Sequence, residues 1–249
     1  MSGPLATGAG GGGGAGGGDS TYTDTYANIP AASNDGNLFF PSDGYSLYRD
    51  TGAAWEVWGP LYPFTLPPAV ADLTWVNQQA ATATRAGGAL HLKTTHTGGN
   101  AVEINALVKA SGAAPWTFSV ALNPYLQNGV NIGICVRQSS DGKLIFFGLQ
   151  ESAGSIYIAG RKFTNPTTHS ADYFSTIYNH FAAVHPMWLR IADDNTNRIL
   201  SVSQNGYDWF ALHSVGRTDF LTADQFGVCV YTYFSPSNTA GSYFTWVEA

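Results

Sequence analysis

From Ala69 to the end of the chain, short runs of alternating apolar and polar residues recur, with Gly, Asn and Asp turns between them. Alternation with a period of two is typical of β-strands that have one buried face, and turns at this spacing connect antiparallel strands. The sequence therefore predicts an antiparallel sandwich or barrel over residues 69–249. The runs are ALHLKTT, AVEINALVK, WTFSVALN, VNIGICVR, KLIFFGLQ, SIYIAGR, MWLRIADD, RILSVSQ, DWFALHS, FGVCVYTYF and SYFTWVEA.

The same alternation assigns side chains to faces, because successive residues of a strand point to opposite sides of the sheet. In WTFSVALN the predicted core face consists of Trp116, Phe118, Val120 and Leu122. In VNIGICVR it consists of Val130, Ile132, Ile134 and Val136. The opposite face of this second run is then free to meet solvent, and it carries Asn131, Gly133, Cys135 and Arg137.

Residues 1–33 form a separate N-terminal arm. Gly8 to Gly18 is almost pure glycine and cannot bury enough apolar surface to offset the entropy of ordering its backbone. We expect either a flexible tether without contacts or an arm that becomes ordered against partner chains.

Residues 34–68 are rich in aromatic residues and proline. The runs GYSLYRD and AAWEVWG flank the turn residues Asp50, Thr51 and Gly52, which predicts a β-hairpin. Prolines from Pro60 to Pro68 then stop further strand pairing, since proline lacks the backbone donor. A domain boundary is predicted near Pro68.

Composition argues against several classes of function. The 249 residues carry a formal net charge of −6, from 17 acidic and 11 basic residues, without any Lys/Arg cluster, so no nucleic-acid partner is expected. The chain start lacks the pattern of a signal peptide, and no apolar stretch is long enough to span a membrane. Only 11% of the residues are charged, against about 25% in ordinary domains, which favours an uncharged polar surface suited to association or sugar contact.

The two cysteines, Cys135 and Cys229, each lie in an apolar strand-like run. Two cysteines make no disulfide framework, which favours free thiols, but a single disulfide between the sheets is the alternative.

The stretch MWLRIADDNTNRILSVSQNGYDWFAL joins a strand ending in WLRI, an Asp/Asn-rich turn, the strand LSVS and an Asn-Gly turn followed by Trp. It resembles the concanavalin A-like lectin/glucanase sandwich. Over residues 38–249, the order of FFPSDGYSLYRDTGAAWEVWGP, LTWVNQQAATAT, PWTFSVALNP, GKLIFFGLQ and SVGRTDFLTADQFG is similar to a type of bacteriophage virion protein that carries such a sandwich. The Gly-rich start is not part of that pattern.

This resemblance implies an all-β fold, a concanavalin A-like jelly roll, and a place in the virion, with the host cytoplasm as the site of assembly. The implied function is non-enzymatic: a tail- or fibre-associated protein that is anchored to other virion proteins by its arm and displays the sandwich toward host-surface glycans. The alternatives are a purely structural capsid decoration or head-fibre protein, and a glycan hydrolase.

A lone two-stranded hairpin is marginally stable in water, so the predicted hairpin needs a partner. Its aromatic residues are expected to form a joint with a neighbouring chain or with the sandwich, and they are Trp55, Trp58, Tyr62 and Phe64. This favours a symmetric homo-oligomer, and the resemblance to fibre-like proteins favours a trimer.

Catalytic and metal-binding patterns are missing from the sequence. Retaining glucanases need two closely spaced carboxylates, and the four glutamates, Glu56, Glu103, Glu151 and Glu248, lie far apart. No histidine has metal-ligand spacing, so no metal or cofactor is expected. A turn rich in oxygen ligands offers calcium as an alternative, although turns need these residue types in any case, and it contains Asp193, Asp194, Asn195 and Asn197.

Sugar binding has the better physical basis, because aromatic side chains stack on sugar rings while amide and guanidinium groups donate to hydroxyls. The outward faces predicted by the alternation supply six candidates. The predicted glycan-binding residues are Asn131, Arg137, Gln150, Arg190, Tyr231 and Tyr233. A solvated sheet face or a protein interface is the alternative for each of them.

Overall fold

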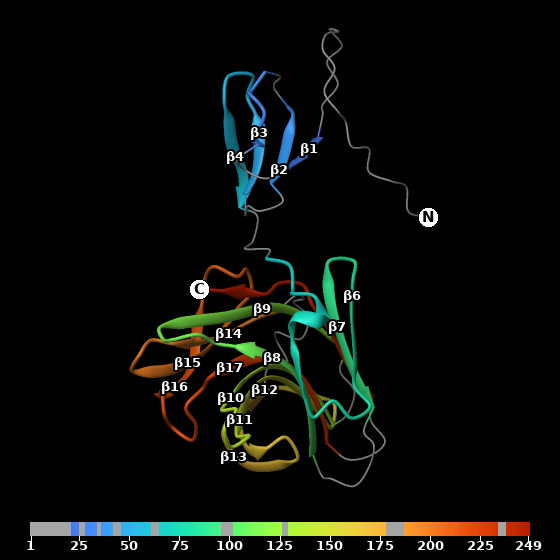
Figure 1. Ribbon diagram of the computed structural model, residues 1–249, viewed down its shortest axis with the longest axis vertical. Helices are drawn as coiled ribbons and strands as arrows, with labels where there is room; N and C mark the ends of the chain where they lie inside the picture. The colour runs from blue at the N-terminus through green and yellow to red at the C-terminus, as the bar shows by residue number, and fades with distance from the viewer. Residues whose placement is uncertain are drawn as a thin grey trace. The chain divides into compact units, whose positions relative to one another are not determined.

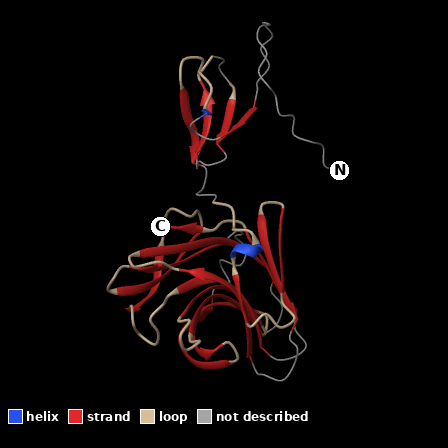
Figure 2. Ribbon diagram, viewed as in Figure 1, coloured by secondary structure: helices blue, strands red, loops and turns tan. Residues whose placement is uncertain are grey.

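A computed structural model describes most of the chain, and nearly all of its regular structure is β-strand (Figure 2). The chain divides into two compact units, Met1–Leu61 and Tyr62–Ala249. No helix in the described part of the chain is long and apolar enough to cross a membrane. The described residues are 21–24, 28–33, 36–41, 46–60, 65–95, 102–125, 129–177, 187–233 and 238–249.

The N-terminal unit contains a four-stranded sheet in the order β1-β2-β3-β4. The predicted hairpin is confirmed as β3 and β4, with Asp50 opposite Trp55. The expectation that this hairpin is a lone pair of strands is wrong, because β2 pairs antiparallel with β3 and β1 pairs parallel with β2. The strands are β1 (Thr21–Asp24), β2 (Leu38–Pro41), β3 (Ser46–Asp50) and β4 (Trp55–Pro60).

Trp55 packs within its own unit. Its indole Nε1 donates a hydrogen bond to the carbonyl oxygen of Pro30 at 2.6 Å. Its ring centroid lies 5.9 Å from that of Phe39, which is fully buried. The sheet therefore has an aromatic cluster of its own. A role in a joint stays a prediction for all four aromatic candidates. The side chain of Trp58 and the whole of Tyr62 and Phe64 lie outside the described residues.

The second unit begins before the predicted boundary at Pro68. The backbone N–H of Trp246 donates to the carbonyl oxygen of Thr65 at 2.8 Å, and Pro67 is buried. The end of the Pro-rich segment is thus part of the sandwich unit.

Two antiparallel sheets form this unit, as predicted (Figure 1). The seven-stranded sheet has the order β13-β12-β11-β10-β17-β8-β5, with β5 (Thr74–Val76), β8 (Val102–Ala110), β10 (Val130–Arg137), β11 (Leu144–Ser152), β12 (Ser155–Asn165), β13 (Thr168–Ile177) and β17 (Gln225–Tyr233). The eight-stranded sheet has the order β16-β15-β14-β9-β18-β7-β6 plus β19 beside β9, with β6 (Thr82–Ala86), β7 (Ala89–Thr95), β9 (Trp116–Tyr125), β14 (Met187–Asp193), β15 (Asn197–Ser203), β16 (Phe210–Gly216), β18 (Asn238–Tyr243) and β19 (Val247–Glu248).

The main core lies between the two sheets and confirms the predicted faces. In β9, Phe118 and Val120 are fully buried in this core, and in β10 so are Ile132 and Ile134. The stacked rings of Phe118 and Phe226, with centroids 4.5 Å apart, join the sheets near one end. Burial of large side chains from both sheets is the main stabilising contribution.

The seven-stranded sheet curls strongly toward its outer face, as the arcs of β10 to β13 show (Figure 1). The turn between β12 and β13 reaches back to β8, where the Ile104 N–H donates to the Pro166 carbonyl oxygen at 2.9 Å. A row of small residues crosses the sheet on this face, which lets neighbouring strands bend together. In register, the row is Ala106, Cys229, Gly133, Gly148, Ala159 and Ser175.

A cluster of polar and aromatic side chains joins the edge strands β13 and β16. The Tyr173 hydroxyl donates to Asp219 Oδ2 at 2.5 Å. Lys162 Nζ lies 4.4 Å from the centroid of the Tyr173 ring and 3.7 Å from Asp219 Oδ2. The His213 ring packs in a tilted arrangement against the same tyrosine ring, with the ring centroids 4.8 Å apart. Burial and Asp219 both raise the pKa of Tyr173, so its hydroxyl stays protonated as a donor.

This cluster predicts a stability that depends on pH. Burial, and secondarily Lys162, lower the pKa of His213 below its ordinary value of 6.5, although Asp219 opposes them. At a pH between the lowered pKa of the folded state and the ordinary value of 6.5, the unfolded state binds more protons than the folded state. The free energy of unfolding therefore falls as the pH drops through 6.5. Urea unfolding at pH 7 and pH 5.5 should show a smaller loss for His213→Gln than for the wild type; equal losses would contradict the assignment.

Candidate functional site

Three of the predicted glycan-binding residues lie together on the outer face of the seven-stranded sheet. Asn131 in β10 is flanked in register by Gln150 in β11 and Tyr231 in β17. The Asn131 side-chain amide donates to the carbonyl oxygen of Tyr231 at 3.5 Å. The alternation therefore placed these three residues on a common face.

The expectation that this face meets solvent is wrong, because the curled sheet fills it with its own side chains. Asn131 and Tyr231 are both fully buried. The Tyr231 ring contacts Phe146 edge-on at 4.8 Å and Phe163 at 5.6 Å. The rings of Phe146, Phe163 and Tyr231 belong to a second apolar core. Its other members are Val76, Val102, Ile104, Ala106, Val108, Cys135, Leu144 and Cys229.

Arg161 completes this closed face, and sequence reasoning did not single it out. One of its guanidinium nitrogens donates to the Tyr231 hydroxyl at 2.6 Å, and another donates to Gln150 Oε1. Asp172 lies 3.3 Å from its Nε. The signal was the alternation Ala159, Arg161, Phe163 in β12, which puts a charged residue on an apolar face. These contacts occupy polar atoms that a sugar would need.

Both cysteines belong to this second core, and they are free thiols, which confirms the favoured interpretation. Burial raises the pKa of the Cys229 thiol, and the neighbouring Cys135 raises it further. The Cys229 thiol is therefore neutral, and both buried cysteines act as small apolar side chains.

The other three predicted residues lie elsewhere. Arg137, at the end of β10, donates to Gln225 Oε1 at 2.7 Å and is half-buried. Arg190 lies on the other sheet, in β14. The backbone of Tyr233 ends β17, while its side chain is outside the described residues. The structure does not bring these three together.

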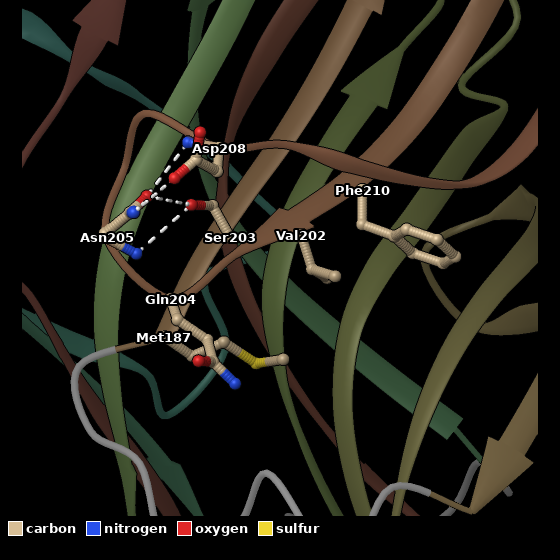
Figure 3. Close-up of a pocket in the computed structure, with 7 residues that line it drawn as sticks. All are labelled: Met187, Val202, Ser203, Gln204, Asn205, Asp208 and Phe210. Atoms are coloured by element: carbon tan, nitrogen blue, oxygen red, sulfur yellow. Dashed lines mark hydrogen bonds between the residues drawn. The ribbon is translucent and has the colours of Figure 1, made fainter.

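A cavity of about 500 Å³ lies where β15 leads into β16 (Figure 3). Met187 and Val202 provide apolar surface, and Phe210, which is 68% exposed, stands on the side opposite the polar residues (Figure 3). The polar side consists of Ser203, Gln204, Asn205 and Asp208. An apolar pocket with a few convergent polar groups is the usual form of a small-molecule site.

The polar side of this cavity is organised before any ligand binds. Asn205 Oδ1 accepts hydrogen bonds from the Tyr207 and Asp208 backbone N–H groups, both at 2.9 Å. The Asn205 amide donates to Asp208 Oδ2 at 2.8 Å, and the Ser203 hydroxyl donates to Asn205 Oδ1 at 3.0 Å. The side chains thus hold one geometry, which reduces the entropy lost on binding.

Arg190 supports the loop that carries these residues. Its guanidinium carbon lies 3.7 Å from the centroid of the Trp209 ring, and Trp209 Nε1 donates to the Gly206 carbonyl oxygen at 3.1 Å. Gly206 has a φ of 78° and lies against the ring of Trp188, so a residue with a side chain would be strained there. Arg190 therefore positions the loop from the opposite side of the sheet, and burial lowers the pKa of its guanidinium.

Carboxylates in the sandwich mostly serve structural contacts. Asp208 is the one acidic residue among the described residues that line the β15–β16 cavity. The segments of the sandwich outside the described residues contain no Asp or Glu. Glu103 is buried, and Glu248 forms an ion pair with Lys109 at 2.8 Å. A second carboxylate facing Asp208 is thus missing from the lining.

The proposed calcium ligands form a tight turn between β14 and β15. Asp194 Oδ1 accepts from the Thr196 and Asn197 backbone N–H groups, and these bonds lower its pKa. Asp193 accepts from the Asn195 N–H at 3.0 Å and from Arg217 Nε at 3.2 Å. These oxygens accept the hydrogen bonds that hold the turn together. The described residues contain no group of three or more His, Cys, Asp or Glu side chains that could hold a metal ion.

Comparisons with known proteins support the fold. No family model matches the chain, and no curated protein is similar to it in sequence. A functionally unknown protein from Saccharomyces cerevisiae has a similar structure, with a TM-score of 0.53, 16% identity, and coverage of 73% of this chain and 98% of that one. A GH43 protein from Bacillus licheniformis has a TM-score of 0.55 and 12% identity, with coverage of 85% of this chain and 45% of that chain.

A xylan beta-1,4-xylosidase from Bacillus halodurans C-125 gives a TM-score of 0.51 and 11% identity, over 85% of this chain and 45% of that one. The chain therefore spans less than half of the two Bacillus proteins. At these identities the likeness establishes the fold class alone: an antiparallel β-sandwich of the concanavalin A-like type, which glycoside hydrolases share.

Proposed function

We propose that the sandwich is a non-enzymatic glycan-binding module whose ligand occupies the β15–β16 cavity. The observation that carries this proposal is the pairing of an exposed aromatic ring, Phe210, with a preorganised polar rim at Asn205 and Asp208. The ring offers an apolar face for a sugar, while the NH₂ group of the Asn205 amide can donate to sugar hydroxyls and the Asp208 carboxylate can accept from them. This moves the site away from the sheet face that the sequence favoured.

Hydrolysis is disfavoured by the lining of the cavity. A glycosidase needs a general acid and a second carboxylate on opposite sides of the scissile bond, commonly about 5–10 Å apart. Asp208 has no such partner among the described lining residues. Incubation with a polysaccharide panel should release no reducing ends. If the wild type releases them and Asp208→Asn does not, the function is hydrolysis and not binding.

Phe210→Ala should weaken glycan binding by about tenfold or more, because it removes the stacking surface while leaving the polar rim in place. The full chain and the variant would be compared on an array of glycans and bacterial polysaccharides, and the best ligand then titrated by calorimetry.

Ile177→Ala is the matched control, since Ile177 is also an exposed apolar side chain, at 55%, and does not line this cavity. Binding to the same ligand should survive this change. The proposal is refuted if Phe210→Ala binds the ligand as tightly as the wild type, or if the folded wild-type chain binds no ligand on the array.

The proposal places this module on a bacteriophage virion, tail- or fibre-associated and attached through the N-terminal arm. The support is the sequence resemblance over residues 38–249 together with the division of the chain into two units. A homo-oligomer, with a trimer expected, would present several glycan sites at once and increase avidity.

Deletion of residues 1–20, which leaves β1 and the Pro30 contact of Trp55 in place, tests this placement. The truncated chain should fold its sandwich but fail to enter particles, because the attachment segment is gone. Circular dichroism would report folding, and immunoblots of purified particles would report incorporation. Normal incorporation of the truncated chain would refute anchoring by the arm.

A further inference from the structure

A second hollow lies on the outer face of the eight-stranded sheet, across β6, β7, β18 and β9. The register aligns its outward side chains in two rows. The first row consists of Thr84, His91, Ser242 and Asn123. The second consists of Thr82, Lys93, Ala240 and Tyr125. Polar side chains from four strands therefore form one continuous surface that shares no residue with the β15–β16 cavity.

Two adjoining cavities make this surface a groove. One has a volume of about 560 Å³ and the other about 270 Å³. Both are lined by Thr82, Lys93, Tyr125 and Ala240, so these residues lie between the two. A groove with two adjacent hollows suits an extended ligand whose repeating units occupy both.

Lys93 gives the groove its charge. It is the one charged side chain among the described residues that line either cavity, and no carboxylate accompanies it. None of the ion pairs among the described residues involves it, whereas Lys109, Lys143 and Lys162 each have a carboxylate within 4 Å. An exposed, unpaired ammonium in a chain of net charge −6 is a local site for an anion.

His91 and Ser242 are held in a fixed arrangement beside Lys93. His91 Nε2 lies 3.1 Å from the carbonyl oxygen of Ala86, which can only accept. Nε2 is therefore a donor of the ring, and Nδ1 lies 2.8 Å from the Ser242 hydroxyl oxygen, whose proton it can accept. The Ser242 oxygen then remains an acceptor for a ligand hydroxyl.

We propose that this groove binds an anionic saccharide, with the carboxylate or phosphate of the ligand at Lys93 and a sugar ring on Tyr125. Tyr125 is 59% exposed and adjoins both hollows, which is the position needed for stacking. Thr82, Thr84 and Asn123 supply hydrogen-bonding groups for sugar hydroxyls. This proposal does not rest on the β15–β16 cavity.

Lys93→Gln in the full chain is the test, with three probes: oligogalacturonate, a sugar-phosphate polymer such as a teichoic acid, and the neutral galactose oligomer obtained by reducing the carboxyl groups of the first. We expect one anionic probe to bind and Lys93→Gln to weaken it by about tenfold, because a charge-assisted hydrogen bond is lost. The probe that binds identifies carboxylate or phosphate as the anion.

Lys143→Gln changes the net charge equally but lies outside the groove, so it should leave binding unchanged. Tyr125→Ala should weaken the same probe, while Phe210→Ala should not, which separates this groove from the β15–β16 cavity. The proposal is overturned if neither anionic probe binds the folded chain, if both lysine variants lose affinity equally, or if the neutral oligomer binds as tightly as the acidic one.

Discussion

Replacing Gly133 with alanine is expected to destabilise the sandwich by about 3 kcal/mol or more, despite adding a single methyl group. A Cβ atom at this position would overlap the carbonyl oxygen of Phe147 and the Cα of Gly148 on the neighbouring strand. Both atoms belong to the β10–β11 ladder and cannot move without breaking its hydrogen bonds. Urea unfolding followed by tryptophan fluorescence would measure the loss.

Gly216→Ala is the matched control, because nothing lies within 4 Å of a Cβ built there. It should leave the free energy of unfolding unchanged or slightly higher, since alanine restricts the unfolded chain. If Gly133→Ala is as stable as Gly216→Ala, the close approach of β10 and β11 does not hold the sheet in its curled form.

Arg198→Met is expected to cost about 3–5 kcal/mol, because it leaves several backbone carbonyls without donors in a buried site. Arg198 is 1% exposed. Its guanidinium donates to the carbonyl oxygens of Arg217, Asp219 and Leu221, at 3.4 Å for Asp219 and 3.1 Å for Leu221. Burial lowers its pKa, but the nearby Tyr173 hydroxyl and the acidic groups oppose that effect.

Lys143→Met removes a surface cation that pairs with Asp141, and it should leave the unfolding midpoint nearly unchanged. The comparison separates a buried from an exposed cation. A loss no larger for Arg198→Met than for Lys143→Met would show that the segment from Arg217 to Leu221 is held by other contacts.

The strands and their core faces could be predicted from the sequence because they depend on local periodicity. A period of two placed Phe118 and Val120 of β9, and Ile132 and Ile134 of β10, on the core side, where the structure has them fully buried. The turns after Asp193 and Ser203 could be predicted for a similar reason, since Asp, Asn and Gly satisfy backbone groups within a few residues.

The number of strands in the N-terminal sheet depended on pairing that periodicity does not report. The parallel partner of β2 is β1, and Thr21 pairs with Leu38. Parallel pairing requires a connection whose length and path are set by the whole unit. The hairpin was therefore predictable, while the two strands that extend the sheet, β1 and β2, were not.

The sequence by itself determined the all-β class, the register-defining turns, the core faces and which residues share a face. The tertiary structure alone decided which faces are open. A row of small residues, including Gly133 and Gly148, lets one sheet curl until Phe146 and Tyr231 fill its outer face. The other sheet keeps Lys93 exposed. Alternation reports which side a residue points to, but solvent access depends on sheet curvature and on what distant segments cover.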